Sequence, residues 1–300
     1  MDENVDLAIP EEFKNIITSY RGAAVIIAGS PRDDDHVMKI SAAFKEQGIR
    51  HMIKAVSAHK QEEESRAVRT NYDAVRGLLA YVFVAGRTDA MSGGHSFNTY
   101  RPGISCPPDH PNDTCLRNPA QSSNAYIAKP RNVATFLAAL FDALEPGVEG
   151  KVNLLLGSPD LPTSHLDSLI NMFPKYGVAH VSLEAHTFND ATSMRHLLDD
   201  HPATINVVVD QPGSKLQWLV SQAGAPTIYN CPVKLTPPQM KEELTDLPAA
   251  YIYDPENVAR FVAQAFTALD PKYKEAILTM NTKKVGENVV YNNKHAGKVY

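Results

Sequence analysis

The chain has 300 residues, an apolar fraction of 43% and a net charge of −5. This length allows one large domain or two moderate ones. The absence of a dense basic run argues against a nucleic-acid partner, and no apolar run is long enough to span a bilayer. Residues 1–20 lack a signal-peptide pattern, and the three cysteines lack metal-ligand spacing. We therefore expect a cytoplasmic protein without disulfides, zinc or a membrane partner.

The first half of the chain alternates between strand and helix patterns. After a polar lead-in with one short helix from Pro10, strands are predicted near 23–28, 52–56, 81–85, 102–105 and 125–128, and helices near 33–47, 61–79, 88–99 and 131–144. Short apolar strands between helices are typical of a parallel sheet that is covered on both faces. The pattern predicts an α/β fold, a three-layer αβα sandwich.

An internal repeat extends this pattern to the second half. The apolar pattern of Asn132–Pro146 returns in Asn257–Pro271, at a constant offset of 125 residues, and Cys106 returns as Cys231 at the same offset. A period this long indicates tandem domains. The predicted domains are 22–147 and 151–285. Strands of the second are expected near 152–156, 179–183, 205–209, 226–230 and 250–253.

The end of the chain is predicted to form one more element. Apolar residues recur at helical spacing between Pro271 and Val285, which predicts an amphipathic C-terminal helix that packs on a neighbouring copy. Residues 286–300 are expected to be loosely ordered or bound to a partner.

Two strand ends in the first half carry polar residues that suit a phosphate. The strand 23–28 runs into Gly29-Ser30, and the next strand leads to Ser57, His59 and Lys60. The carboxyl ends of parallel strands open onto one edge, where α/β proteins bind ligands. A helix N-terminus, a hydroxyl and a lysine together suit an anion, and the histidine can move a proton near neutral pH. Each feature alone is common in α/β sheets, so the prediction depends on their occurring at consecutive strands.

Four motifs resemble the aminoimidazole ribonucleotide (AIR) carboxylase family, the PurE-type enzymes of purine biosynthesis. They are Gly29-Ser30-x-x-Asp33, Ser57-Ala58-His59-Lys60, Ala85-Gly86-Arg87-Thr88-Asp89-Ala90-Met91-Ser92-Gly93 and Ile104-Ser105-Cys106-Pro107-Pro108. The lysine after the histidine and the Ala-Gly-Arg motif resemble the class II branch, which uses carbon dioxide directly. The resemblance covers residues 22–145 well and 151–280 faintly. It implies two tandem flavodoxin-like domains, each with a parallel sheet.

The resemblance also implies roles for single residues. The substrate-binding residues would be Ser30, Asp33, Ser57, Lys60, Gly86, Arg87 and Thr88, and the catalytic proton-transfer residue would be His59. The first two match positions that hold the ribose phosphate end of the substrate, and residues 86–88 match the loop that closes over the imidazole and carbon dioxide. The segment Leu116–Gln121 resembles the family's Leu-Arg-x-Pro-Ser-Gly loop without its Ser-Gly end. No metal or other cofactor is implied.

The chemistry of such an enzyme needs few groups. The ring of AIR is an enamine whose C4 is nucleophilic, and carbon dioxide is an electrophile, so the reversible carboxylation to CAIR needs neither ATP nor biotin. The protein must hold both reactants together, and His59 would then remove the C4 proton. Backbone N–H groups of residues 86–88 would stabilise the new carboxylate.

The second copy lacks this equipment. The aspartate position is Leu161, the second motif reads Glu184-Ala185-His186-Thr187, and the third loop has become Asp210–Ser214. We expect this copy to keep the fold and to have lost the site; a second anion site is the rival interpretation, but it lacks a nearby cation. Because PurE-type enzymes are octamers, the tandem chain is predicted to form a homotetramer.

Two other functional classes stay open. One is a non-catalytic paralogue with a structural or nucleotide-binding role, favoured by the altered Thr88-Asp89 and Pro119-Ala120-Gln121 motifs. The other is a flavodoxin-like binder of flavin or nucleotide. The remaining histidines are interpreted as surface or packing residues, among them His36, His51, His110, His165 and His196.

Overall fold

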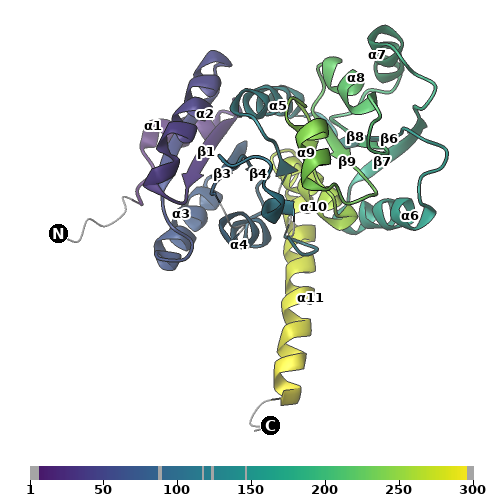
Figure 1. The fold of residues 1–300 in the computed structure, drawn as a ribbon. Coiled ribbons are helices and arrows are strands. Elements are labelled where there is room, and N and C mark those ends of the chain that lie inside the picture. Colours follow the sequence, from purple (N-terminus) through teal and green to yellow (C-terminus); the bar gives the residue numbers. More distant parts are fainter. Residues whose placement is uncertain (1–6, 87–89, 117, 123–124, 146, 296–300) are drawn as a thin grey trace.

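The computed structural model describes residues 7–86, 90–116, 118–122, 125–145 and 147–295. Its centre is a ten-stranded sheet in the order β2-β1-β3-β4-β5-β10-β9-β8-β6-β7 (Figure 1). The strands are β1 (Ala23–Ala28), β2 (Arg50–Ala55), β3 (Leu79–Val84), β4 (Gly103–Ser105), β5 (Ala125–Tyr126), β6 (Lys151–Leu156), β7 (Ala179–Glu184), β8 (Ile205–Val209), β9 (Thr227–Asn230) and β10 (Ala250–Tyr251). The predicted α/β fold is confirmed.

The two halves of the sheet have the same strand order and meet at its middle. All neighbouring strands are parallel except β5 and β10, which pair antiparallel through Tyr126 and Tyr251. These two residues are separated by the repeat offset of 125 positions. The two halves of the sheet are therefore joined edge to edge into one continuous sheet, which also removes two exposed strand edges.

Helices cover both faces of the sheet. They are α1 (Glu11–Thr18), α2 (Asp34–Glu46), α3 (Glu62–Ala74), α4 (Ala90–Asn98), α5 (Pro130–Ala143), α6 (Thr163–Met172), α7 (Ala191–Asp200), α8 (Leu216–Gln222), α9 (Pro237–Leu244), α10 (Pro255–Phe266) and α11 (Pro271–His295), with 3₁₀ turns η1 (Pro31–Asp33), η2 (Asp113–Leu116) and η3 (Pro174–Tyr176). Helix α3 ends at Ala74, five residues before the predicted end, because Val75 is extended and Gly77 has a φ of +117°.

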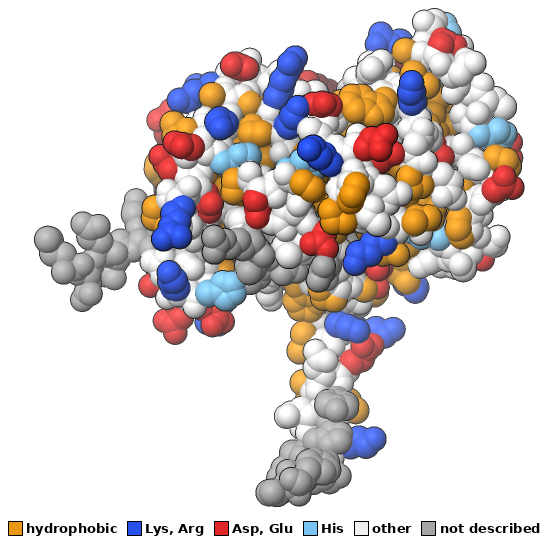
Figure 2. All heavy atoms as spheres, in the orientation of Figure 1, with side chains coloured by type: hydrophobic (Ala, Val, Ile, Leu, Met, Phe, Trp, Pro, Cys, Tyr) orange, Lys and Arg blue, Asp and Glu red, His pale blue; other side chains and the backbone are white. Residues whose placement is uncertain are grey.

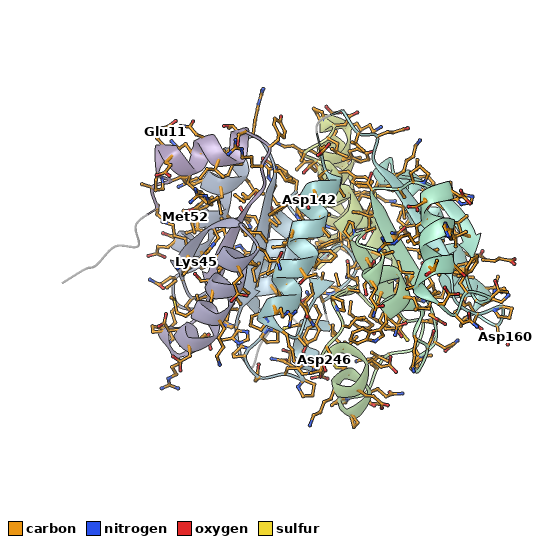
Figure 3. All side chains as sticks on the ribbon, turned by 90° about the horizontal axis from the view of Figure 1, so that it is seen from above. Glu11, Lys45, Met52, Asp142, Asp160 and Asp246 are labelled. Carbon is orange, nitrogen blue, oxygen red and sulfur yellow. The ribbon has the colours of Figure 1, made fainter. Side chains whose placement is uncertain are left out.

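A single apolar core runs across one face of the sheet and through both halves. Alternate residues of β1 divide between the two faces, with Ile26 in this core and Val25 in a second cluster under α1, α3 and α4. Helices α5 and α10 contact each other in the shared core, where the rings of Phe136 and Phe261 lie 6.3 Å apart between centroids. Seen from above, α5 with Asp142 lies near the middle of the molecule, beside α2 (Figure 3).

Helix α11 extends well beyond its predicted end. The expectation that this helix packs on a neighbouring copy is wrong for its first turns, which bury Tyr273 and Ile277 in the chain's own core. The rest of the helix leaves the body of the protein (Figure 1). The expectation that the chain is loosely ordered from residue 286 is wrong for residues 286–295, which continue the helix. Hydrophobic side chains are visible along the projecting part (Figure 2), and about half of the surface of Val285 and Val289 is exposed.

Two further features describe the surface and the helices. Basic and acidic side chains are interspersed over the face shown in Figure 2. Within the described ranges, no helix combines the length and the apolar character that a membrane span requires.

Candidate active site

The strand order β2-β1-β3 places three loops at one edge of the first half. Ala28 at the end of β1 pairs with the last residues of β2 and β3, Ala55 and Val84. The N–H of Gly29 donates to Val84 O at 2.9 Å, and the N–H of Val56 donates to Ala28 O at the same distance. The loops that begin at residues 29, 57 and 86 are therefore neighbours. Such an edge is the usual ligand position in open α/β sheets.

The first loop forms a compact corner around Gly29 and Ser30. The Ser30 side chain caps η1 by accepting a hydrogen bond from the N–H of Arg32 at 3.2 Å. A Cβ on Gly29 would lie 3.1 Å from Met91 Cε and 3.6 Å from Ala85 Cβ, so the missing side chain lets the corner approach the start of α4. Asp33 is the N-cap residue of α2, and both it and Ser30 stay partly exposed.

The second loop holds His59 in a turn on the protein surface. Ser57 and Gln61 fix this turn from its two ends: the N–H of Lys60 donates to Ser57 Oγ at 3.3 Å, and the N–H of Ser57 donates to Gln61 Oε1 at 3.2 Å. His59 and Lys60 are exposed, so both side chains are accessible to a ligand. A histidine in packed hydrocarbon would have excluded the predicted proton transfer, and His59 is not buried in that way.

A cavity adjoins the His59 turn on the side of α3 and α4. It has a volume of about 380 Å³ and is lined by Ala58, Glu62, Ser65, Arg66, Arg69, Gly94, His95 and Asn98. His95 is buried there, with its Nε2 2.7 Å from Ser65 Oγ. Burial, with a smaller contribution from Arg69, lowers the pKa of His95 to about 4, so its imidazole is neutral at physiological pH.

The third loop begins at Gly86, and a carboxylate from the segment after β4 lies beside it. This residue, Asp109, was not among the predicted site residues. A Cβ on Gly86 would lie 3.8 Å from both carboxylate oxygens of Asp109, and Asp109 Oδ1 accepts a hydrogen bond from Asn112 Nδ2 at 3.0 Å. Burial and the nearby Asp109 charge both raise the pKa of Asp33. The sequence feature that could have identified Asp109 is its position directly after the Cys-Pro-Pro motif that follows β4. The predicted residues Arg87 and Thr88 lie outside the described residues.

His36 is a packing residue at the same edge. Its Nε2 lies 3.1 Å from the carbonyl oxygen and 3.4 Å from the Sγ of Cys106, so the imidazole ties the first turn of α2 to the end of β4. Burial is the main reason that the pKa of His36 is lowered. His36 lies in the first turn of α2, three residues after Asp33. Its contacts with Cys106 identify it as a packing residue and not a surface residue.

The loop that departs from the family motif keeps an unusual backbone. Gln121 occupies the glycine position of the resembled Leu-Arg-x-Pro-Ser-Gly loop, and its φ is +70°. This left-handed conformation is unfavourable for a residue with a Cβ. Gln121 is also buried, and its Oε1 has no hydrogen-bond partner among the residues that the structure describes. The conformation that glycine would adopt freely is thus retained by a strained glutamine.

In the second half, carboxylates occupy the corresponding corner. The N–H of Gly157 donates to Val209 O at 2.9 Å, as Gly29 does to Val84. A Cβ on Gly157 would lie 2.2 Å from the Asp210 carboxylate, whereas the first half has the small methyl group of Ala85 at the equivalent position. Buried Glu243 accepts a hydrogen bond from the N–H of Gly213 at 2.6 Å, and burial raises the pKa of both acids. These acids occupy space and repel anions.

Comparison with known proteins decides the family. Residues 23–142 match the family model described as AIR carboxylase. Phosphoribosylaminoimidazole carboxylase of Treponema denticola is 30% identical over 146 residues, which cover 46% of this chain and 91% of that protein. This chain belongs to the AIR carboxylase family. The enzyme of the same name from Archaeoglobus fulgidus is 31% identical over 135 residues, covering 43% of this chain and 74% of the relative.

A solved structure gives a further comparison. The crystal structure of Treponema denticola PurE is 31% identical in sequence, covers 41% of this chain and 82% of its own, and has a TM-score of 0.39. The AIR carboxylase match spans all eight predicted site residues, from Ser30 to Thr88. Among the described residues, no group of three or more His, Cys, Asp or Glu side chains is placed to hold a metal ion.

Proposed function

We propose that this protein is an AIR carboxylase of the class II type, which reversibly carboxylates 5-aminoimidazole ribonucleotide at C4 with carbon dioxide. The observation that carries the proposal is the convergence of the Ser30 corner, the exposed His59 turn and Gly86 at one sheet edge, in a chain that matches 91% of a named carboxylase. The proposed roles of the single residues depend on their positions at this sheet edge. A cytoplasmic location follows from the proposed role in purine synthesis.

The substrate's phosphate would bind where the first two loops meet. Ser30 supplies a hydroxyl, the N-terminal end of α2 follows directly after η1 with its positive helix-dipole end, and exposed Lys60 supplies a cation. Asp33 is an acceptor, so it suits a ribose hydroxyl rather than the phosphate. Ser57 contributes by holding the turn, since its Oγ already accepts a hydrogen bond from the N–H of Lys60.

His59 would complete the reaction after the carbon–carbon bond has formed. The ring electrons of the enamine attack carbon dioxide, and one C–O π pair moves to oxygen, which gives a carboxylate and a ring that still carries the C4 proton. His59 takes this proton, the ring regains its aromatic electrons, and the imidazolium returns the proton to solvent. A general base in such a step typically contributes about 10²–10⁴-fold to the rate. Backbone N–H groups after Gly86 would stabilise the carboxylate.

The test is turnover of AIR and carbon dioxide, and of CAIR in the reverse direction, by the purified chain. His59→Asn should lower kcat by about 10²-fold or more, because the proton acceptor is lost. His186→Asn is the matched control, since His186 follows the same alanine in the second half and is exposed there as well. Full activity of the His59 variant would refute the assignment. Inactivity of the unmodified chain would favour the alternative function, a non-catalytic paralogue. The left-handed backbone of Gln121 in the altered loop supports that alternative.

We further infer that the chain is a tandem duplication with domains 22–147 and 151–285, of which only the first is catalytic. Residues that are equivalent in the repeat contact each other, Tyr126 with Tyr251 and Phe136 with Phe261, as at the axis of a symmetric dimer. The exposed apolar residues of projecting α11 suit contact with further copies of this chain. Native mass spectrometry should find four copies of the 32.9 kDa chain. A monomer would contradict the proposed tetramer.

A further inference from the structure

A second cavity, of about 440 Å³, lies at the opposite edge of the first half. Its first-half walls are the segments that precede β1, β3 and β4, whereas the candidate active site uses the segments that follow β1, β2 and β3. The second half closes the cavity with the junction between α10 and α11. The lining residues are Tyr20, Ala74, Val75, Arg76, Gly77, Tyr100, Arg101, Thr267, Ala268, Leu269, Pro271 and Lys274.

All charged side chains in this lining are cationic. They are Arg76, Arg101 and Lys274, and no acidic side chain is among the lining residues. Arg101 is 3% exposed and donates to the carbonyl oxygens of Gly77 and Val75, while its Nε meets no hydrogen-bond partner within the described segments. The charge of Arg101 is offset by a nearby buried carboxylate, that of Asp73.

The other two cations lack such compensation. In the part of the chain that the structure describes, no ion pair involves Arg76 or Lys274. The ammonium group of Lys274 lies 4.0 Å from the centroid of the Tyr100 ring, which holds it at the cavity wall without neutralising it. Two uncompensated cations on facing walls, one from each half of the chain, make the cavity attractive to a dianion.

An exposed aromatic residue, Tyr20, lines the cavity. It has a φ of +58°, and 41% of its surface is exposed. The left-handed conformation belongs to the end of α1, because Tyr20 directly follows the C-cap residue Ser19. Leu269 adds an apolar surface from the second half. The cavity thus combines cationic walls with an aromatic and an aliphatic surface.

We propose that this cavity binds a small phosphomonoester that carries a planar organic group. The phosphate would contact Arg76 and Lys274, and the planar group would contact Tyr20 and Leu269. The volume lies within the range of about 300–1,000 Å³ that is typical of small-molecule sites. A bound ligand would connect the segment before β3 to the start of α11. The proposal goes beyond carboxylation, since it concerns a separate site.

Calorimetric titration of the full chain tests this proposal, with adenosine 5′-monophosphate as the probe. We expect a saturable site on each chain whose Kd depends on Arg76 and Lys274; any binding of the probe at the candidate active site would depend on Lys60 instead. Lys274→Gln and Arg76→Gln should each raise Kd by about tenfold or more, because each removes a charge-assisted contact. Lys272→Gln is the matched control: it removes the same charge two residues away, from a lysine that pairs with Asp270 at 3.8 Å and does not line the cavity. Its Kd should equal that of the unmodified chain.

A second control separates the two sites. Lys60→Ala should leave the Kd of the probe unchanged, since Lys60 belongs to the candidate active site at the other edge. The proposal would be overturned if Lys60→Ala raised the Kd of the probe while Lys274→Gln did not. It would also be overturned if binding did not saturate at millimolar probe. Equal affinity for adenosine would refute the phosphate contact, and equal affinity for ribose 5-phosphate would refute the ring contact. Lys274→Arg should retain binding. None of these results depends on carboxylase activity.

Discussion

Arg260 of α10 joins the second half to the helix that follows the third site loop. Its side chain is fully buried. One terminal nitrogen donates to Asn281 Oδ1 at 2.7 Å, and the other donates to the carbonyl oxygen of Phe97 at 2.8 Å, with Ser96 O and Thr99 O at 3.4 Å. These carbonyls lie at the C-terminus of α4, where backbone acceptors lack partners within the helix. A guanidinium there satisfies them and complements the helix dipole.

We predict that Arg260→Ala lowers the free energy of unfolding by about 3 kcal/mol. Leaving a buried acceptor unsatisfied costs about 1–3 kcal/mol, and truncating a long buried side chain adds a packing loss. The total stays near 3 kcal/mol because two other donors remain: Gln264 Nε2 still contacts Ser96 O and Thr99 O at 3.2 and 3.1 Å, and Asn281 Nδ2 still contacts Phe97 O at 2.9 Å. The main losses are the acceptor of Asn281, left without its donor, and the packed side chain itself.

Urea unfolding followed by the fluorescence of Trp218 measures this change, with the m-value as a check that the transition stays comparable. Arg260→Met separates packing from hydrogen bonding, because it fills much of the same volume without a donor. Thr135→Ala is the matched control at the equivalent repeat position, since Thr135 is exposed and its side chain donates only to the carbonyl of Arg131, one turn earlier in α5. An Arg260→Ala chain within 0.5 kcal/mol of the unmodified protein, about the scatter of ordinary surface substitutions, would refute the reasoning.

Two further predictions concern buried polar residues. Burial raises the pKa of Asp73 to about 6, despite hydrogen bonds from Thr99 and Tyr81. The folded state therefore binds the proton of Asp73 more tightly than the unfolded state does. As pH rises from about 4 to 6, the free energy of unfolding should fall by about 3 kcal/mol. Asp73→Asn should flatten this dependence in denaturant titrations at several pH values; a surviving slope would contradict the assignment. Gln121→Gly should raise the free energy of unfolding by about 1 kcal/mol, because glycine relieves the left-handed φ of +70°. Gln121→Ala, which keeps a Cβ in that conformation, should show no such gain in thermal unfolding.

Local patterns predicted the strands of the first half well. The continuous apolar run 23–28 predicted a strand buried on both faces, and the structure has this strand, with Gly29 and Ser30 following its end. The pairing of β5 with β10 was not predictable in the same way. Each strand has only two residues, and their antiparallel contact depends on α5 and α10 packing together through Phe136 and Phe261.

The extent of α11 and several site residues also depend on longer-range effects. Gly286 suggested an end to the helix, because glycine costs about 1 kcal/mol in a helix interior, yet the helix continues past it to His295. Asp109 and His36 reach the sheet edge only through tertiary structure. Asp109 follows β4, which pairs with β3, and His36 of α2 contacts Cys106 at the end of β4. No local spacing links His36 to Cys106, which lies 70 positions away in the sequence.

The contacts of Arg260 tie the second half to the first in a way that an exact repeat of the first half would not. At the equivalent positions of the first half the chain has Thr135 and Ala139, neither of which could reach and satisfy several carbonyls at once. Arg260 and Gln264 therefore make contacts that two identical copies would not make. They fix the C-terminus of α4, and the start of the same helix places Met91 against Gly29 at the candidate site. Under the proposed function, the second half would therefore support the geometry of the site in the first half, because a rigid helix transmits position along its axis.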